Sequence, residues 1–430
     1  MRRVSTSPPP RSVLRRRPVV AWAFYDWANS AFATTVMAGF FPVFFKQYWN
    51  AGVVATESTF RLGVTSGVAS LLVAIMAPML GAIADRSSSR MRMLMMVTVL
   101  GCASTAGLAL VGEGHWLAAA ALYLVASLGF WGGIVFNDSL LLHVAEPEEY
   151  DLVSGFGYAM GYLGGGLLFA LNVLMTLKPQ WFGLADASAA VRVSFVMVGV
   201  WWFVFALPCA FLVRERKSAP SVPPAEAIRL GLRELGKTIR ELRRYRPIVW
   251  FLAAYWLYID GVNTVIKMAV DYGLSLGFAA SNLVAALLLT QFVAFPAALA
   301  FGWLGRRIGA RKGIFIALSV YVGATVYAYF IEGVRDFFVL AVIVGLVQGG
   351  IQSLRRSYFG RLVPEGKSSE FFGFYNMMGK FAAVLGPLLM AIVARLTGDS
   401  RLSILSILVL FVAGGTLLVV AARAERRAAA

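Results

Sequence analysis

Long apolar stretches alternate with short polar connections along most of this chain. A helix needs about 20 apolar residues to cross the hydrocarbon core of a bilayer, and stretches of about that length recur throughout the sequence. Twelve of them are predicted to span a membrane: 19–45, 61–84, 93–111, 117–142, 154–177, 193–213, 248–270, 279–304, 313–331, 336–358, 371–394 and 402–422. We therefore expect an all-α integral membrane protein, and the even number of spans predicts that both termini lie on one side.

Composition agrees with a membrane environment. Of 430 residues, 59% are hydrophobic and 14% are charged, and the mean hydropathy is +0.73, values that water-soluble domains of this length do not normally reach. Cys102 and Cys209 both lie in apolar stretches, so the sequence carries no disulfide framework and no metal-ligand spacing. We expect no metal site and no cofactor.

Basic residues indicate the orientation, because Lys and Arg in short loops stay on the cytoplasmic side. With a cytoplasmic N-terminus, the same side also receives the basic loops near residues 86–92, 306–312 and 355–367 and the C-terminal arginines. The net charge of +17 is then a topology signal and an attraction to anionic lipid headgroups, and does not indicate nucleic-acid binding. We expect a monomer in a bacterial inner membrane with both termini cytoplasmic.

The first span resembles a signal peptide in part, since six arginines precede an apolar stretch with an Ala-x-Ala pattern at Ala31 to Ala33. However, the apolar run continues to Phe45, and Asp26 and Asn29 interrupt it. We expect an uncleaved membrane span.

A basic, Pro- and Ser-containing segment divides the chain into two sets of six spans. We expect a basic tail at 1–18, a first bundle at 19–213, a linker at 214–247, a second bundle at 248–422 and a tail at 423–430. In the linker, apolar residues recur at helical spacing from Ile228 to Leu242 with Arg and Lys on the other face. This pattern predicts an amphipathic helix on the inner membrane surface.

The two bundles repeat one another in sequence. Gly132-Gly133-Ile134 matches Gly349-Gly350-Ile351, and Pro147 and Tyr158 match Pro364 and Tyr375 at the same offset. Asp26, Asn29 and Ser30 in the first span correspond to Asp260, Asn263 and Thr264 in the seventh. Positions i, i+3 and i+4 share one helix face. Because ionisable groups are costly in lipid, two such triplets favour a polar central cavity over simple helix-to-helix bonding.

These features resemble the major facilitator superfamily. The segments "YDWANSAFAT", "YIDGVNTVI", "SGFGYAMGYLGGGL" and "GGIQSLRRSYFGRLVPEGKSSEFFGFYNMMGK" are similar to the branch that contains the fungal vacuolar amino-acid effluxers linked to autophagy and their bacterial relatives. The resemblance implies two six-helix bundles around a cavity that opens alternately to each side. It also implies that the first, fourth, seventh and tenth spans line that cavity.

Further polar residues within the spans are candidates for the substrate or proton pathway: Tyr25, Asn137, Asp138, Lys267, Gln348, Gln352, Arg355, Tyr375 and Lys380. An amino acid needs an acceptor for its ammonium group, for which Asp26 and Asp260 are candidates. It needs a donor for its carboxylate, for which Arg355, Lys267 or Lys380 are candidates. Asp26 and Asp260 are also the candidates for proton coupling. Lys380 has a structural interpretation as well, an ion pair with Asp26 or Asp138.

The loop after the second span, "GAIADRSSSR", resembles the cytoplasmic latch of the superfamily. Gly81 allows close helix approach, and the resemblance gives Asp85, Arg86 and Arg90 a gating role. The second copy keeps Arg307 and Arg311 but has no acid at the equivalent of Asp85, so we expect a different second latch. Gly157, Gly161 and Gly165 form a small-residue stripe on the fifth span, suited to tight helix packing.

The sequence does not favour an enzyme, although a membrane-embedded acyl or phosphoryl transferase stays an alternative. "GRLVPEGKSS" misses the phosphate-loop spacing by one residue, and only two histidines, His115 and His143, occur. We expect a secondary active transporter that moves a small solute, most simply an amino acid, by proton-coupled efflux. The alternative is an exporter or flippase of a lipid-like or amphiphilic substrate, which the aromatic content of 13% also suits.

Overall fold

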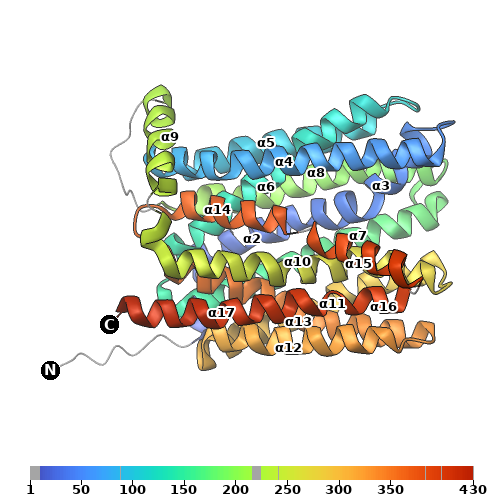
Figure 1. Cartoon of the computed structure of the whole chain (residues 1–430). Coiled ribbons are helices and arrows are strands. Elements are labelled where there is room, and N and C mark those ends of the chain that lie inside the picture. Colours follow the sequence, from blue (N-terminus) through green and yellow to red (C-terminus); the bar gives the residue numbers. More distant parts are fainter. Residues whose placement is uncertain are drawn as a thin grey trace.

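The computed structural model describes residues 10–87, 89–215, 224–240, 242–382, 384–398 and 400–429. Within these ranges, twelve helical segments are long and apolar enough to cross a membrane, and each overlaps a predicted span. They run side by side in one bundle (Figure 1). The predicted all-α fold with twelve transmembrane helices is confirmed.

The N-terminal half holds the first six spans, after a short helix α1 (Pro10–Leu14). The first span consists of α2 (Arg17–Ala31), η1 (Phe32–Phe40), α3 (Phe41–Phe44) and η2 (Phe45–Trp49). The next five are α4 (Ala55–Ser87), α5 (Arg90–Gly107), α6 (Trp116–Val144), α7 (Tyr150–Leu177) and α8 (Ala187–Leu212). Short turns of 3-10 helix lie at their connections: η3 (Leu108–Leu110), η4 (Pro147–Glu149) and η5 (Pro179–Phe182).

The C-terminal half follows the linker helix α9 (Pro224–Arg240) and η6 (Leu242–Tyr245). Its spans are α10 (Arg246–Ser275), α11 (Ala280–Ile308), α12 (Ala310–Tyr329), α13 (Val334–Leu362), α14 with α15 (Ser368–Phe381 and Leu385–Thr397), and α16 with α17 (Ser400–Leu405 and Leu408–Ala429). The described residues near both termini lie at the end of the bundle that carries α9 (Figure 1). We call this the basic end.

Two spans depart from the regular α-helix that the pattern predicted. The first span is π-helical in η1 and η2. The eleventh span, predicted as one helix over 371–394, breaks between α14 and α15. Because backbone groups within a bilayer need internal hydrogen-bond partners, such a break requires compensating side chains, and α10 provides them as described below.

The two halves approach each other most closely where glycines replace side chains. A Cβ atom at Gly81 of α4 would lie 2.0 Å from the carbonyl oxygen of Ser369 in α14, and one at Gly373 would lie 2.5 Å from the carbonyl of Ala77. At the second crossing, a Cβ atom at Gly155 of α7 would lie 2.8 Å from the Cα of Gly302 in α11. Backbone therefore meets backbone at both of these crossings.

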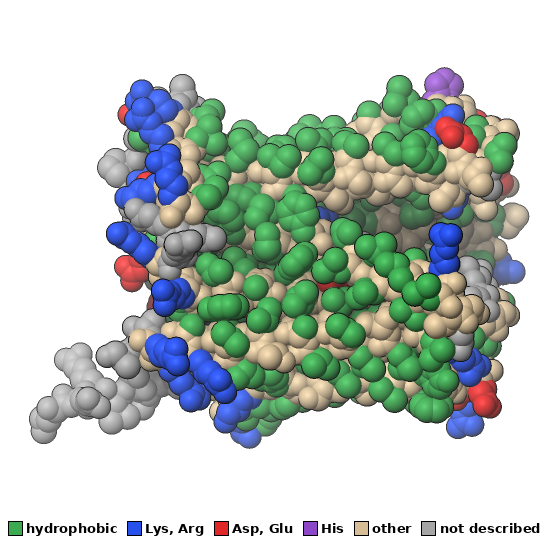
Figure 2. All heavy atoms as spheres, in the orientation of Figure 1, with side chains coloured by type: hydrophobic (Ala, Val, Ile, Leu, Met, Phe, Trp, Pro, Cys, Tyr) green, Lys and Arg blue, Asp and Glu red, His purple; other side chains and the backbone are tan. Residues whose placement is uncertain are grey.

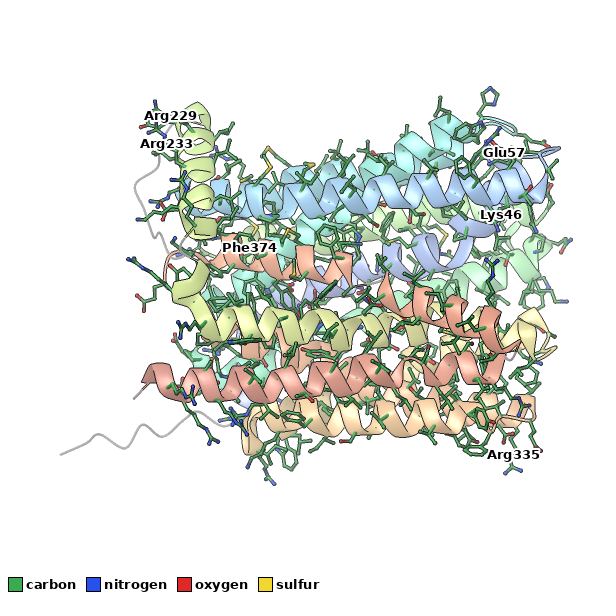
Figure 3. The ribbon with its side chains drawn as sticks, viewed as in Figure 1. Lys46, Glu57, Arg229, Arg233, Arg335 and Phe374 are labelled. Carbon is green, nitrogen blue, oxygen red and sulfur yellow. The ribbon has the colours of Figure 1, made fainter. Side chains whose placement is uncertain are left out.

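The linker helix α9 lies across the basic end and joins the two halves. Glu234 pairs with Arg86 of α4 at 2.8 Å and with Lys367, directly before α14, at 2.9 Å. The hydrogen bond from Lys367 lowers the pKa of Glu234, although partial burial acts in the opposite direction. Figure 3 shows Arg229 and Arg233 of α9 at this end. Helix α9 thus lies within the predicted linker and contacts both bundles.

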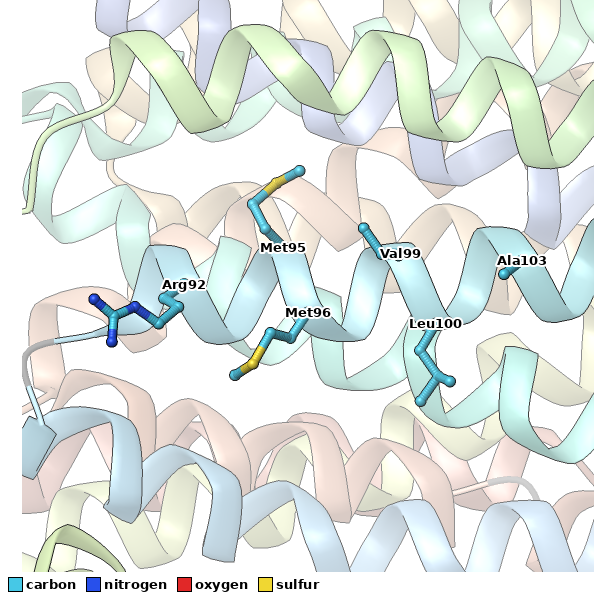
Figure 4. A pocket seen from close by; sticks show the side chains of 6 residues that line it. All are labelled: Arg92, Met95, Met96, Val99, Leu100 and Ala103. Atoms are coloured by element: carbon cyan, nitrogen blue, oxygen red, sulfur yellow. The ribbon is translucent and has the colours of Figure 1, made fainter. Parts of the chain in front are cut away.

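The surface separates into an apolar belt and charged ends. Hydrophobic side chains cover the flanks, Lys and Arg gather at the basic end, and a hollow lies between the halves at the opposite end (Figure 2). A shallow groove along α5 is lined almost wholly by apolar side chains of that one helix, including Met95, Met96 and Leu100 (Figure 4). A groove of this kind suits contact with lipid acyl chains.

Candidate functional site

A buried cluster of three charges joins the two halves. Arg356 of α13 donates to Asp26 of α2 from both terminal nitrogens at 3.1 Å, and to Asp138 of α6 at 3.0 Å. The side chains of Arg356, Asp138 and Asp26 are 1%, 4% and 13% exposed. We call these three residues the ion cluster. Its cation comes from one half of the molecule and both acids come from the other.

Other groups complete the surroundings of Arg356. Its Nε donates to the Ser154 hydroxyl at 2.9 Å, and its Nη2 donates to the Ser154 carbonyl at 3.1 Å. The guanidinium also lies 4.7 Å from the ring of Trp22 and 4.2 Å from that of Tyr158. Both acids and both rings belong to the N-terminal half, so the Arg356 side chain inserts into that half and holds the two together.

The acids of the ion cluster have further amide partners. Asn137 donates to Asp26 Oδ1 at 3.1 Å, while Asn376 of α14 contacts Asp138 Oδ2 at 3.4 Å. The side-chain oxygen of Asn137 is buried and has no hydrogen-bond partner within the described ranges. Asp26, Asn137 and Asp138, all predicted pathway residues, are therefore brought together, and an acceptor beside them is unoccupied.

Arg355, the neighbour of Arg356, faces the C-terminal half. It donates to the Tyr255 hydroxyl at 3.2 Å, and its guanidinium lies 5.0 Å and 5.7 Å from the rings of Tyr255 and Tyr375. Among the residues that the structure describes, it forms no salt bridge, and its Nε is without a partner. Buried hydroxyl groups of Tyr258 and Tyr375 are also without partners. Arg355 is thus a half-buried cation held by aromatic rings, with donor capacity left.

The remaining predicted residues of the tenth and eleventh spans lie near this region. Gln352 accepts a hydrogen bond from Tyr162 across the interface between the halves at 3.0 Å, and Gln348 is 9% exposed. The Lys380 ammonium lies 3.1 Å from the centre of the Trp131 ring in α6, an arrangement typical of a cation–π contact. Lys267 lies in α10, but its side chain is outside the described residues.

Three predicted residues of the first span are used for packing. The Tyr25 side chain is fully buried and bonds to Thr98 at 2.9 Å inside the N-terminal half, away from the ion cluster. A Cβ atom at Gly161 of α7 would lie 2.6 Å from the Ser30 hydroxyl oxygen. Asn29 is 3% exposed, and in the part of the chain that the structure describes its side-chain nitrogen has no hydrogen-bond partner.

The triplet of the seventh span has a different environment from its sequence counterpart. Asp260 is fully buried and accepts from the backbone amides of Leu385 and Gly386 at 2.9 Å and 2.8 Å. Asn263 donates to the carbonyl of Ala382 at 2.7 Å, and Thr264 donates to Asp260 at 3.3 Å. The triplet thus satisfies backbone groups on both sides of the break between α14 and α15.

This placement corrects the prediction for Asp260. The repeat predicted a carboxylate facing the central cavity, but both oxygens are bound to the N-terminus of α15, where a negative charge is favourable. A Cβ atom at Gly386 would lie 1.9 Å from the Thr264 hydroxyl oxygen, so the contact is possible only with glycine. Asp260, Asn263 and Thr264 therefore stabilise the broken helix within the C-terminal half.

The predicted latch loop closes the basic end between α4 and α14. Asp85 accepts from the backbone amides of Ser369 and Glu370 at 3.0 Å and 2.9 Å. Arg90 binds Asp85 Oδ1 at 2.7 Å and the Ser369 hydroxyl at 2.9 Å. We call Asp85, Arg90 and the N-terminus of α14 the Asp85 latch. Arg86 takes no part in it, because it pairs with Glu234 of α9.

A second set of charged contacts joins the two halves at this end, at residues other than the predicted gating residues Arg307 and Arg311. Asp151 of α7 accepts from both terminal nitrogens of Arg361 in α13, at 2.9 Å and 2.8 Å, and from the Ser357 hydroxyl. Arg307 and Arg311, the predicted gating residues, stay within the C-terminal half. Arg307 stacks on Trp303 at 3.7 Å, and Arg311 lies 3.8 Å from Glu425.

Arg356, Asp151 and Arg361 are the residues that sequence analysis missed as site residues. Arg356 and Arg361 lie in a basic stretch that the sequence analysis explained by membrane orientation, so their pairing with acids was not predicted. One signal was available: the constant offset that aligns Tyr158 with Tyr375 also aligns Asp138 with Arg355, so an acid in one half stands where the other half has a base. Among the described residues, no group of His, Cys, Asp and Glu is arranged to hold a metal ion.

Comparison with protein families gives the chain a place among known proteins. The family model described as "Vacuole effluxer Atg22 like" matches residues 48–148 and 142–430, which is more than half of the chain. The chain belongs to this Atg22-like family. The predicted membership of the major facilitator superfamily, in the branch of the autophagy-related effluxers, is confirmed.

Individual relatives of the Atg22-like chain include bacterial and fungal proteins. It is 39% identical over 396 residues to the uncharacterized MFS-type transporter YxiO of Bacillus subtilis, with 92% of each chain covered. It is 27% identical over 276 residues to autophagy-related protein 22-1 of Emericella nidulans, which covers 58% of this chain and 46% of that protein. The chain thus spans about half the length of this fungal relative.

Solved structures support the same fold. The proton:xylose symporter XylE superposes with a TM-score of 0.70 at 10% identity, covering 95% of each chain. The human organic anion transporter MFSD10 gives 0.68 at 16% identity, covering 96% of this chain and 100% of that one. FucP in its outward conformation gives 0.67 at 12% identity, covering 96% and 99%. Family and fold are those of transporters and not of enzymes.

Proposed function

We propose that this Atg22-like chain exports a small zwitterionic solute, an amino acid in the simplest case, by proton-coupled alternating access. The observation that carries the proposal is the ion cluster, in which two acids of one half hold an arginine of the other beside a second arginine without an acidic partner among the described residues. Transport as such follows from the family. Substrate, coupling and direction are the proposal.

Arg355 is the proposed receptor for the carboxylate of the solute. Its guanidinium has unused donor capacity, and planar guanidinium groups bind carboxylates through two parallel hydrogen bonds. The rings of Tyr255 and Tyr375 lie beside it and supply apolar surface for a side chain. The unpartnered hydroxyls of Tyr258 and Tyr375 offer further polar contacts.

Asp26 is the proposed acceptor for the ammonium group and for the transported proton. It is the most exposed member of the ion cluster, at 13%, and the unpartnered oxygen of Asn137 lies beside it. Protonation of Asp26 removes one of the two negative charges that hold Arg356. This weakens the bond between the halves, so proton binding and opening of the basic end are linked.

The structure represents the state closed at the basic end in the proposed cycle. The Asp85 latch, the Asp151–Arg361 pair and the ion cluster all bind one half to the other, while the hollow lies at the opposite end (Figure 2). We assign the basic end to the cytoplasm because basic loops remain on that side. The efflux direction is taken from the description of the family.

The test is transport by purified protein in liposomes with an imposed pH gradient and a panel of labelled amino acids. We expect saturable amino-acid flux that is coupled to proton movement, loss of coupling in Asp26→Asn, and a KM raised at least tenfold in Arg355→Gln. Glu57→Gln and Arg335→Gln remove the same charges at the opposite end (Figure 3) and serve as matched controls.

Two outcomes contradict the proposal. Coupled flux that is unchanged in Asp26→Asn removes the proton role of that residue. Flux only of amphiphilic or lipid-like solutes, with none for amino acids, replaces the proposal by an exporter or flippase of such substrates, because the apolar surroundings of Arg355 then accommodate a larger anion.

A further inference from the structure

A second polar pocket lies at the basic end, between the ends of α2, α6 and α8 in the N-terminal half. The residues of its wall that matter here are Arg16, Arg17, His143, Phe211, Arg214 and Glu215. It is separate from the ion cluster, and no step of the proposed transport cycle uses it.

The pocket has an excess of positive charge. Arg16 pairs with Glu149. Arg17 and Arg214 are exposed, and neither forms an ion pair with an acid in the described part of the chain. Two guanidinium groups that share one pocket without acidic partners suit an anion with several acceptor oxygens, above all a phosphate group.

The same pocket has an apolar wall that continues onto the flank of the bundle. Phe211 and Leu212, the last residues of α8, are 77% and 46% exposed. Directly beyond them the chain becomes polar at Arg214. This sequence of an apolar flank followed by arginines matches the change from acyl chain to headgroup at a membrane surface.

We propose that this pocket binds the phosphate of an anionic phospholipid, with Arg17 and Arg214 on the phosphate and the acyl chains along Phe211 and Leu212. Free inorganic phosphate shares the charged end of this chemistry but has no group for the apolar wall. A lipid uses both parts of the pocket.

The back of the pocket is in contact with the Asp85 latch. Glu215 accepts from the backbone amide of Arg90 at 3.2 Å, and His143 Nε2 lies 3.3 Å from Arg90 Nη1. Arg90 in turn holds Asp85, which binds the N-terminus of α14. A lipid that fixes Arg214 also fixes its neighbour Glu215, and thereby supports Arg90 in the orientation that keeps the latch closed.

Binding is tested by native mass spectrometry of the full-length protein in detergent, titrated with phosphatidylglycerol or phosphatidylcholine. We expect one phosphatidylglycerol to bind more tightly than phosphatidylcholine. The double variant Arg17→Gln with Arg214→Gln should weaken that lipid by about 30-fold, from the contribution of two basic residues near a membrane surface. Lys312→Gln with Arg423→Gln removes the same charge elsewhere and is the matched control.

The link to the latch is tested by hydrogen exchange at the Ser369 and Glu370 amides, which bond to Asp85. Phosphatidylglycerol should slow their exchange in the wild-type protein and in the control, but not in the pocket variant. Equal binding in the pocket variant and the control overturns the site. If millimolar inorganic phosphate displaces bound phosphatidylglycerol as effectively as added lipid does, the lipid assignment is overturned. If phosphatidylglycerol binds tightly but does not slow exchange at the Ser369 and Glu370 amides, the link to the Asp85 latch is overturned.

Discussion

Gly157 of α7 lies so close to the ion cluster that a single methyl group would disturb it. A Cβ atom there would lie 2.4 Å from Asp26 Oδ2 and 2.8 Å from Arg356 Nη2. It would also lie 2.8 Å from Cζ3 of the Trp22 ring, which is fully buried. In Gly157→Ala the ends of the Asp26 and Arg356 side chains therefore move apart, and the Trp22 ring shifts as well. The perturbation acts on the bond between the halves and on the packing of α2 against α7.

The magnitude follows from the two hydrogen bonds between Arg356 and Asp26, each 3.1 Å long. A hydrogen bond to a charged group contributes about 1.5–3 kcal/mol. The helix propensity gained by Gly→Ala is the same in both states, because α7 is helical in each, and it cancels. If one of the two bonds is lost, the closed state is weakened by about 1.5–3 kcal/mol relative to an open one, a shift of roughly 10- to 150-fold in the equilibrium between them.

The assay is pulsed electron paramagnetic resonance, which measures the distance between two spin labels. Arg92→Cys at the start of α5 and Lys312→Cys at the start of α12 place one label on each half at exposed positions of the basic end; Cys102 and Cys209 are buried. We expect Gly157→Ala to add a population with a longer distance.

Gly323→Ala in α12 is the control for this experiment, because a Cβ atom there meets nothing within 4 Å. We expect it to leave the distances unchanged. Identical distance distributions for Gly157→Ala, Gly323→Ala and the parent would refute the view that the ion cluster holds the two halves together.

The remaining predictions concern the latches, the broken helix and the linker. Asp85→Asn and Arg361→Gln should each shift the free-energy difference between the closed and open states by about 1–3 kcal/mol toward the open one, since each loses a charged bond between the halves. The same assay should show a larger longer-distance population, and no change in either variant would remove the latch roles. Gly386→Ala should lower the melting temperature, since its Cβ collides with Thr264, and adding Thr264→Ala should restore part of the loss; a Gly386→Ala protein as stable as the parent contradicts this contact. Because the pKa of Glu234 is lowered by Lys367, the stability that this carboxylate gives to the docking of α9 is present above the ordinary glutamate pKa and is lost as the pH falls through the lowered value. The protection of the α9 amides, measured as the hydrogen-exchange rate relative to the intrinsic rate at each pH, should therefore decrease in acid for the parent. Glu234→Gln should remove that dependence.

The spans and the close glycine contacts could be predicted from the sequence because they depend on local patterns. Apolar stretches of sufficient length predict membrane helices whatever surrounds them, and the glycine spacing on the fifth span indicated tight packing. The structure agrees: a Cβ atom at Gly161 or Gly165 would collide with α2 at Ser30.

The roles of the two repeated acids could not be predicted in the same way. Asp26 and Asp260 occupy equivalent positions in the repeat, yet one binds an arginine of the other half and the other caps α15. The difference depends on the break in the eleventh span. Gly386-Pro387 was a signal for it, because proline is favoured in the first turn of a helix. The signal was not specific, because Pro78, Pro208 and Pro296 lie inside the continuous helices α4, α8 and α11.

The two adjacent arginines show a second limit. Side chains at neighbouring positions on a helix point about 100° apart, so Arg355 and Arg356 necessarily face different partners. Which of them meets the acids of the N-terminal half depends on the rotation of α13 within the bundle, and no local pattern specifies that rotation.

Helix α7 has glycine on two of its faces, with Gly155 against α11 and Gly157 and Gly161 against α2. Larger side chains at these crossings would interdigitate with those of the neighbouring helices, and any displacement of α7 would then have to separate them. With glycine at these positions, α7 can shift or rotate against its neighbours with less steric resistance. The energetic barrier to rearrangement at α7 is therefore set by the polar bonds along it, so the rate of the cycle is open to adjustment by changing single hydrogen-bonding side chains without rebuilding the helix contacts.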